Sequence, residues 1–303
     1  MNKLPINGVL LLNKSLGMSS NIALQRAKRI FNAEKAGHTG SLDPLATGML
    51  PICFGEATKF SQFLLDADKT YVATGKLGEK TETADAEGAV IETKPVPELT
   101  PAAFEAVLDK FRGQSQQVPS MYSALKHQGR PLYELARQGM TVERAARAIH
   151  IHQLDLVDLS GDNFTIKVQC SKGTYIRNLV EDIGDEIGCG AHVTQLDRIG
   201  VANFTQNMYT LAELEQIQAQ SVDELYKCLL PIDILVKALA KCELTNAQAK
   251  LLLQGQLVDF KGKNSQVGVH ALYNEQHQFI GVGEILADGK IKAKRMMRQG
   301  ACS

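Results

Sequence analysis

Long hydrophobic runs are missing from this sequence. Near the start the longest apolar run is Val9–Leu12, four residues, whereas a signal peptide needs about 7–15 apolar residues and a membrane helix about 20. We therefore expect a soluble, cytoplasmic protein. A disorder-promoting composition is missing as well, because 44% of the residues are hydrophobic and 22% are charged. The length of 303 residues favours two domains.

Cysteine pairs and metal-ligand clusters are missing too. The six cysteines show no Cys-x-x-Cys spacing, which favours reduced thiols over a disulfide framework or a zinc site. They are Cys53, Cys170, Cys189, Cys228, Cys242 and Cys302. Of the seven histidines only His150 and His152 lie close together, and on a strand they would share a face without further ligands nearby. We expect no metal site.

Cofactor and nucleophile motifs are also absent. The sequence contains no G-x-x-x-x-G-K-[ST] loop, and Gly281-Val282-Gly283 lacks the third glycine of a dinucleotide fingerprint. No G-x-S-x-G motif or cysteine–histidine nucleophile pattern occurs. We therefore expect no nucleotide cofactor.

Net charge is zero, with 33 basic and 33 acidic residues, but the charges are segregated. Acids dominate Glu79–Asp109, whereas bases dominate Met1–Lys59 and Lys110–Ala148, and five bases without an acid lie in residues 290–298. One such cluster alone is typical of a solvated surface. Several together indicate a positive face that fits a nucleic acid.

Hydrophobic periodicity predicts strands and helices along the chain. We expect a strand at Gly8–Leu12, a helix capped by Ser19 or Ser20 and ending near Phe31, a loop over Ala33–Pro51, strands at Tyr71–Leu77 and Phe164–Cys170, and a helix over Ile176–Ile187. A basic insertion is expected at Ser120–Ala148, and short terminal strands at Val267–Tyr273, Phe279–Leu286 and Lys290–Lys294.

The stretch Gly37–Gly48 (GHTGSLDPLATG) is the richest in chemical groups. Its glycines allow close backbone approach, and Pro44 restricts Asp43 to an extended conformation. A lone acid in a polar loop is commonly a turn residue. With His38 five residues upstream, the loop can instead present a carboxylate and an imidazole to one pocket.

Two other stretches carry weaker patterns. Asp66-Ala67-Asp68 followed by Thr70 resembles a magnesium-dependent aspartyl phosphatase motif, but a solvated turn explains it better. In Ser171–Arg177, the arginine could pair with a carboxylate from another loop, and an ordinary surface arginine is the plainer interpretation.

Taken together, these stretches resemble the bacterial tRNA pseudouridine-55 synthases, the TruB family. The resemblance begins at Ile6–Ser20 (INGVLLLNKSLGMSS) and continues through Ala36–Phe60, which contains GSLDPLATG. It extends through Gly113–Gly139, Cys170–Gly184 (CSKGTYIRNLVEDIG) and Gly188–Val201 (GCGAHVTQLDRIGV). Ordered motifs thus span nearly all of the first 200 residues.

The resemblance implies an α+β pseudouridine-synthase fold with a mixed, mainly antiparallel central sheet. It implies a catalytic domain over residues 1–230, with an RNA-gripping insertion at about 120–148. A small β-rich, PUA-like RNA-binding domain is expected over 240–303. The implied reaction is isomerisation of uridine 55 in the T-loop of tRNA to pseudouridine, with base flipping and no cofactor. The implied partner is the T-arm of tRNA, and we expect a monomer.

The resemblance also implies three catalytic residues. Asp43 falls on the catalytic aspartate, and Arg177 on the arginine that pairs with it and favours its charged form. Tyr71 falls on the tyrosine that stacks on the target base, and it can help to remove the C5 proton. Whether the aspartate attacks C1′, assists loss of the C2′ proton or attacks C6 stays open.

Further positions are implied to bind substrate: His38, Lys59, Tyr71, Tyr175 and Leu196. Two positions depart from the family pattern, because Glu82 replaces an aspartate and Asp197 stands where a basic residue is usual. Two rival functions remain: a magnesium-dependent hydrolase that uses Asp66 and Asp68, and a non-catalytic RNA-binding protein.

Overall fold

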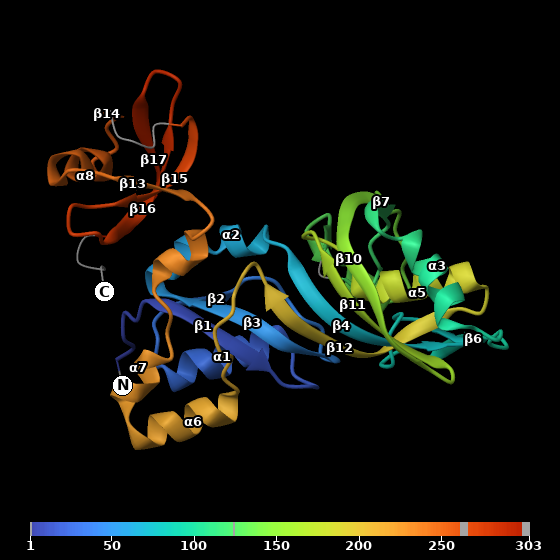
Figure 1. The fold of residues 1–303 in the computed structure, drawn as a ribbon. Helices are drawn as coiled ribbons and strands as arrows, with labels where there is room; N and C mark the ends of the chain where they lie inside the picture. Colours follow the sequence, from blue (N-terminus) through green and yellow to red (C-terminus); the bar gives the residue numbers. More distant parts are fainter. Residues whose placement is uncertain (1, 124, 261–265, 299–303) are drawn as a thin grey trace.

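The computed structural model describes residues 2–123, 125–260 and 266–298. Cys302 therefore lies outside the described residues. Within these ranges, no helix is long and apolar enough to cross a membrane. The chain forms two lobes, and the C-terminal sheet stands beside one end of a larger sheet (Figure 1).

The larger sheet has eight strands in the order β1-β3-β12-β4-β11-β10-β7, with β2 paired to β3. Only β12 and β3 run parallel, and the other pairs are antiparallel. The expected α+β fold with a mixed, mainly antiparallel sheet is confirmed. The strands are β1 (Gly8–Lys14), β2 (Ala36–His38), β3 (Ala46–Phe54), β4 (Lys69–Leu77), β7 (Gly113–Gln117), β10 (Arg147–Ser160), β11 (Asn163–Cys170) and β12 (Ala191–Val201).

Helices cover the sheet at both ends (Figure 1). The helices α1 (Ser20–Ile30), α6 (Leu211–Gln220) and α7 (Val222–Lys227) lie near β1, and α3 (Pro101–Asp109) and α5 (Ile176–Ile187) lie near β10 and β12. The α1 helix begins as expected, because the Ser19 side chain accepts a hydrogen bond from the Ile22 N–H. The α5 helix buries the periodic apolar residues that predicted it, and it ends at Gly188 in a left-handed conformation.

The continuous apolar sequence of β1 follows from burial on both faces. Leu10 and Leu12 pack in the core beneath α1, whereas Val9 and Leu11 pack in a second cluster on the other face. That second cluster, called here the shared cluster, joins side chains of both lobes, among them Phe60 and Phe279.

The loop expected over Ala33–Pro51 is wrong, because β2 and most of β3 lie inside that range and the loop is only residues 39–45. Gly48 and Pro51, which normally argue against a strand, caused the error. The Pro51 carbonyl accepts the Thr39 N–H at 3.1 Å. The nitrogen of Pro51 therefore points away from β1, and its missing N–H removes no hydrogen bond between β1 and β3. Gly48 has no side chain, which allows β12 to approach β3 closely.

The segment expected as an insertion lies between β7 and β10, which pair with each other. It contains small elements and a hydrophobic cluster of its own, formed by Met121, Leu132 and Leu135. The small elements are β8 (Lys126–His127), β9 (Arg130–Pro131) and α4 (Leu132–Ala136). Elsewhere lie the hairpin β5 (Glu79–Thr81) and β6 (Val90–Thr93), and the short helices η1 (Gly55–Phe60), α2 (Gln62–Leu65) and η2 (Ile232–Val236).

The C-terminal lobe is a five-stranded sheet in the order β13-β15-β16-β17-β14. The three expected terminal strands are confirmed to within two residues. The elements are β13 (Ala240–Glu243), α8 (Asn246–Leu253), β14 (Val258–Asp259), β15 (Gly268–Tyr273), β16 (Phe279–Ile285) and β17 (Lys290–Met296). The sheet begins at Ala240, where the sequence predicts a second domain. Its folding as an independent domain stays a prediction.

Candidate active site

Loop 39–45, which joins β2 to β3, carries Asp43. Ser20, at the start of α1, holds this loop by two hydrogen bonds to Leu42. The Ser20 hydroxyl donates to the Leu42 carbonyl at 2.9 Å and accepts from the Leu42 N–H at 2.7 Å. The structure thus separates the two serines that the sequence left as alternative helix caps: Ser19 caps α1 and Ser20 fixes the loop.

Two buried cations, Lys14 and Arg198, also donate hydrogen bonds to backbone carbonyls of loop 39–45 and its neighbourhood. The Lys14 ammonium donates to the carbonyls of Met18 at 2.7 Å and Pro44 at 3.4 Å, and burial lowers the pKa of Lys14 to about 8. The Arg198 guanidinium donates to the Gly40 carbonyl at 3.1 Å. Loop 39–45 is therefore fixed from three elements: β1, α1 and β12.

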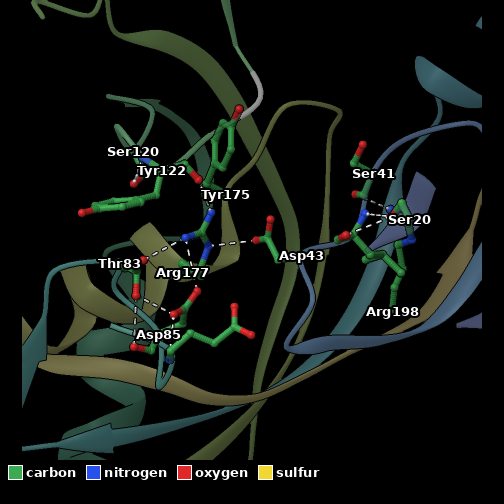
Figure 2. Close-up of polar contacts among 12 residues, drawn as sticks. Ser20, Ser41, Asp43, Thr83, Asp85, Ser120, Tyr122, Tyr175, Arg177 and Arg198 are labelled. Carbon is green, nitrogen blue, oxygen red and sulfur yellow. Dashed lines mark hydrogen bonds and ion pairs between the residues drawn. The ribbon is translucent and has the colours of Figure 1, made fainter. Parts of the chain in front are cut away.

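Asp43 forms an ion pair with Arg177, which lies in the first turn of α5. Arg177 Nε is 3.0 Å from Asp43 Oδ2. The same guanidinium donates to the carbonyls of Thr83 at 2.9 Å and Tyr122 at 2.8 Å, and it lies 3.3 Å from Asp85 Oδ2. Figure 2 shows Arg177 at the centre of these contacts. The arginine is fixed in one orientation, and the pairing that the resemblance implies is present.

The two carboxylates beside Arg177 differ in exposure. The Asp85 side chain is 3% exposed, and it accepts hydrogen bonds from the Thr83 hydroxyl and the Glu87 N–H. The Asp43 side chain is 45% exposed because it opens on a cavity, although protein atoms surround it. This enclosure raises the pKa of Asp43, and Arg177 offsets the rise only in part. Burial therefore sets the net direction of the pKa shift, while Arg177 favours the charged form of Asp43.

The cavity at Asp43 has a volume of about 760 Å³, within the usual range for pockets that enclose a small molecule. His38, Asp43 and Arg177 line one part of it, and Tyr133 and Arg137 of the insertion line another. Other lining residues include the acids Glu82, Asp85 and Glu87.

The structure brings His38 to this cavity with Asp43. Burial lowers the pKa of His38, and the nearby charge of Arg198 lowers it further, so the neutral imidazole is favoured. Among the described residues, His38 Nδ1 is buried and has no hydrogen-bond partner. A buried ring nitrogen without a partner is costly.

Tyr71 and Leu196 do not line the cavity in the described structure. Leu196 on β12 is the register partner of Ala46 and Ala73 and is 8% exposed. Tyr71 on β4 is 9% exposed, and burial raises the pKa of its hydroxyl while Arg198 opposes the rise. A base that stacks on Tyr71 therefore requires the ring of Tyr71 to become more exposed than it is in this structure.

Tyr175 and Lys59 are placed differently. The Tyr175 backbone, just before α5, donates to Gln117 Oε1 at 2.8 Å and accepts from Gln117 Nε2 at 3.0 Å, and the side chain lies beside Arg177 in Figure 2. The Lys59 ammonium lies 2.6 Å from Glu56 Oε2 and donates to the Met296 carbonyl at 3.1 Å. Lys59 thus joins the two lobes outside the cavity, and its binding to RNA stays a prediction.

The two acids proposed for a magnesium-dependent hydrolase, Asp66 and Asp68, form ion pairs outside the cavity. Asp66 pairs with Lys172 at 2.7 Å, and Asp68 Oδ2 lies 3.1 Å from His152 Nε2. The rings of His150 and His152 stack on one face of β10, as the alternation predicts. In the part of the chain that the structure describes, no group of three or more histidine, cysteine or acidic residues could hold a metal ion.

Sequence reasoning missed Ser20, Asp85 and Arg198 as residues that build the site. No local spacing marks them, because their contacts join residues far apart in the chain. The Asp197 departure is accommodated locally, since its carboxylate accepts the Thr47 hydroxyl at 3.0 Å.

Comparisons with protein-family models cover nearly the whole chain. Residues 28–176 match "TruB family pseudouridylate synthase (N terminal domain)". Residues 177–237 match "tRNA pseudouridylate synthase B C-terminal domain", and residues 240–297 match "Pseudouridine synthase II TruB, C-terminal".

Individual proteins are similar over the same length. The chain is 53% identical over 294 residues to tRNA pseudouridine synthase B of Actinobacillus pleuropneumoniae, which covers 96% of each chain. It is 52% identical over 301 residues to tRNA pseudouridine synthase B of Aeromonas salmonicida, covering 97% of this chain and 94% of the relative. A solved chain in a "Cbf5-Nop10-Gar1 Complex" shares the fold, with a TM-score of 0.73 and 24% identity over 96% of this chain and 84% of that chain.

Proposed function

Because the chain belongs to the TruB family of pseudouridylate synthases, we propose that it converts uridine 55 in the T-loop of tRNA to pseudouridine, with Asp43 as the catalytic carboxylate. The enzyme is a pseudouridine synthase and thus an isomerase. The observation that carries the assignment of Asp43 is its ion pair with Arg177 at the wall of the cavity. The proposal includes a cytoplasmic location, where tRNA is found, and a monomer.

The reaction is balanced without a co-reactant. The N1–C1′ bond breaks and a C5–C1′ bond forms, while C5 loses its hydrogen as a proton and N1 gains one. We assign to Asp43 the step that breaks the first bond, because its Oδ2 is held by Arg177 and Oδ1 has no hydrogen-bond partner among the described residues. We assign to Tyr71 the exchange of the C5 proton through its hydroxyl, which passes its own proton on to N1 or to water.

The target base must leave its stack to reach Asp43, since a base inside a folded loop is not accessible to a carboxylate. In the proposed complex His38 contacts the RNA beside Asp43, and Tyr133 and Arg137 of the insertion contact it from another part of the cavity lining. The basic strand β17 and the insertion contact phosphates of the T-arm. Recognition then depends on the shape of the folded arm more than on a long sequence.

The test maps pseudouridine in an unmodified tRNA transcript after incubation with the purified protein. We expect one modified position, uridine 55, on a prefolded transcript and also in excess EDTA. Asp43→Asn should abolish the product, while the affinity for tRNA stays within about tenfold, or about 1.4 kcal/mol. The amide has the same shape but can act neither as nucleophile nor as base.

Asp66→Asn is the matched control, because Asp66 pairs with Lys172 outside the cavity. We expect wild-type turnover from this variant. Turnover by Asp43→Asn would remove Asp43 from the mechanism. Loss of activity in Asp66→Asn, or a loss in EDTA that magnesium restores on a prefolded substrate, would instead assign a role in turnover to Asp66 and Asp68.

A further inference from the structure

Arg198 on β12 is the bulkiest of the fully buried side chains and is 1% exposed. Within residues 2–123, 125–260 and 266–298, no ion pair to a carboxylate within 4.0 Å is formed by Arg198. Burying a cation without an opposite charge is costly, so such a residue persists only where other groups satisfy its donors. The contacts of Arg198 therefore indicate what it holds in place.

Backbone carbonyls of β3 and of loop 39–45 accept the hydrogen bonds of Arg198. Its Nε donates to the Met49 carbonyl at 2.7 Å, Nη2 donates to Gly40 at 3.1 Å, and Nη1 donates to Ser41 at 3.5 Å. Ser41 lies two residues before Asp43. In Figure 2 Arg198 lies next to Ser20 and Ser41, on the side of Asp43 opposite to Arg177.

The same side chain faces Tyr71. Arg198 and Tyr71 are register partners in the antiparallel pair of β12 and β4, and directly opposed residues project from the same face about 5 Å apart. The charge of Arg198 opposes the rise that burial causes in the pKa of the Tyr71 hydroxyl. Arg198 thus contacts the loop that carries Asp43 and lies directly opposite the tyrosine proposed to exchange the C5 proton.

We propose that Arg198 is a positioning residue, whose guanidinium fixes loop 39–45 and the Tyr71 hydroxyl relative to each other. This inference rests on the proposed function, which assigns the reacting groups to Asp43 and Tyr71. Lysine cannot replace the arginine, because a single ammonium lacks the planar fork that reaches several acceptors at once. In this proposal Arg198 does not touch the substrate. Its replacement therefore changes the reaction through the positions of Tyr71 and loop 39–45.

The first test is Arg198→Lys, assayed for single-turnover conversion of tRNA that carries protium or deuterium at C5 of uridine 55. We expect the rate to fall at least tenfold and the deuterium isotope effect to rise above the wild-type value, because a misplaced Tyr71 hydroxyl slows removal of the C5 proton. The affinity for tRNA should stay within about threefold. An unchanged isotope effect in a slowed, folded variant would overturn the proposal, as would a wild-type rate.

Lys69→Gln is the matched control. Lys69, on β4, is buried like Arg198, and its ammonium also donates to backbone carbonyls. These are the carbonyls of Leu64 at 3.0 Å and Leu65 at 2.8 Å, which lie outside loop 39–45. Its replacement should lower the melting temperature without raising the isotope effect. If the isotope effect of Lys69→Gln rose as much as that of Arg198→Lys, lost stability alone would explain the rise, and the proposal would be overturned.

A second experiment leaves Arg198 intact and applies even if its variants do not fold. Ser20 contacts the loop and not Tyr71, so Ser20→Ala and Tyr71→Phe act independently unless Arg198 couples them. We expect the double variant to be slowed at least threefold less than the product of the two single effects. Multiplicative effects would overturn the proposal. If the wild-type enzyme makes no pseudouridine at uridine 55, the proposed function fails instead.

Discussion

At the scale of single residues, one arginine serves two carboxylates in different surroundings. Asp85 is enclosed and hydrogen-bonded, whereas Asp43 faces the cavity. Arg177 touches both, so its charge cannot be assigned to either alone. The enclosed carboxylate fixes the guanidinium, and the guanidinium in turn orients the carboxylate that faces the cavity.

The raised pKa of Asp43 gives a pH dependence with a definite sign. Turnover requires the carboxylate form, so the single-turnover rate should fall on the acid side at a higher pH than an aspartate with the ordinary pKa of 3.8 would give. A rate that stays constant down to the ordinary aspartate pKa would contradict the raised value.

The same shift affects stability. A carboxyl whose pKa is raised in the folded state binds its proton more tightly there than in the unfolded chain, so its ionisation disfavours folding. Asp43→Asn should therefore melt at a higher temperature than the wild type at neutral pH. The difference should shrink as the pH falls through the raised pKa of Asp43 and be gone below the ordinary aspartate pKa of 3.8. Melting curves at several pH values measure this, and a less stable variant at neutral pH would contradict it.

At the scale of elements, the contact between β3 and β12 positions the site. Gly48 on β3 has φ of +94°, and an added Cβ would lie 2.2 Å from Asp197 Oδ1 and 2.4 Å from the Arg198 carbonyl. Only glycine allows the parallel strand to approach this closely. Gly48, which argued against a strand in the sequence, is thus the residue that makes the pairing of β3 with β12 possible.

Gly48→Ala should destabilise the protein by about 2 kcal/mol or more, because backbone strain and overlap with β12 add together. Urea unfolding measures this difference. Gly161→Ala in the turn between β10 and β11 is the control, since Gly161 has φ of +56° and no atom within 4 Å of its added Cβ. It carries the strain without the overlap, so its cost should be smaller. Equal costs would argue against the close contact.

At the scale of the whole molecule, the shared cluster connects the two lobes. Phe60 on η1 packs edge-on against Phe279 on β16, with ring centroids 5.2 Å apart, and Tyr273 lies 5.7 Å from Phe279. The Tyr273 hydroxyl donates to Asp233 Oδ2 at 3.0 Å. Because β1 and β3 also contribute to this cluster, the C-terminal sheet packs on the back of the strands that carry the site.

Phe279→Ala should therefore destabilise more than the C-terminal lobe. Truncation of a buried phenylalanine costs about 3–5 kcal/mol, and we expect the wild type and the variant each to unfold in a single calorimetric transition, with the variant at a lower temperature. Two separate transitions in the wild type, with only one shifted in the variant, would contradict the coupling. That result would support two independently folding domains.

The sequence by itself determined much of the local structure, with β2 and β3 as the exceptions. The apolar periodicity of α1 and α5 and the alternation of β4 and β11 predicted these elements, because local burial patterns and backbone preferences depend on neighbouring residues. The motif around Asp43 and its resemblance to the TruB family also pointed to the loop and to Arg177. These features require no knowledge of distant contacts.

Only the tertiary structure decided how the site is assembled. Asp85 became recognisable through its contact with Arg177 of α5, and Arg198 through its hydrogen bonds from β12 to loop 39–45. Lys59 proved to join the two lobes. The net direction of the Asp43 pKa depends on how many atoms enclose it. Such quantities are sums over groups that are distant in the chain and close in space, so no local pattern of the sequence encodes them.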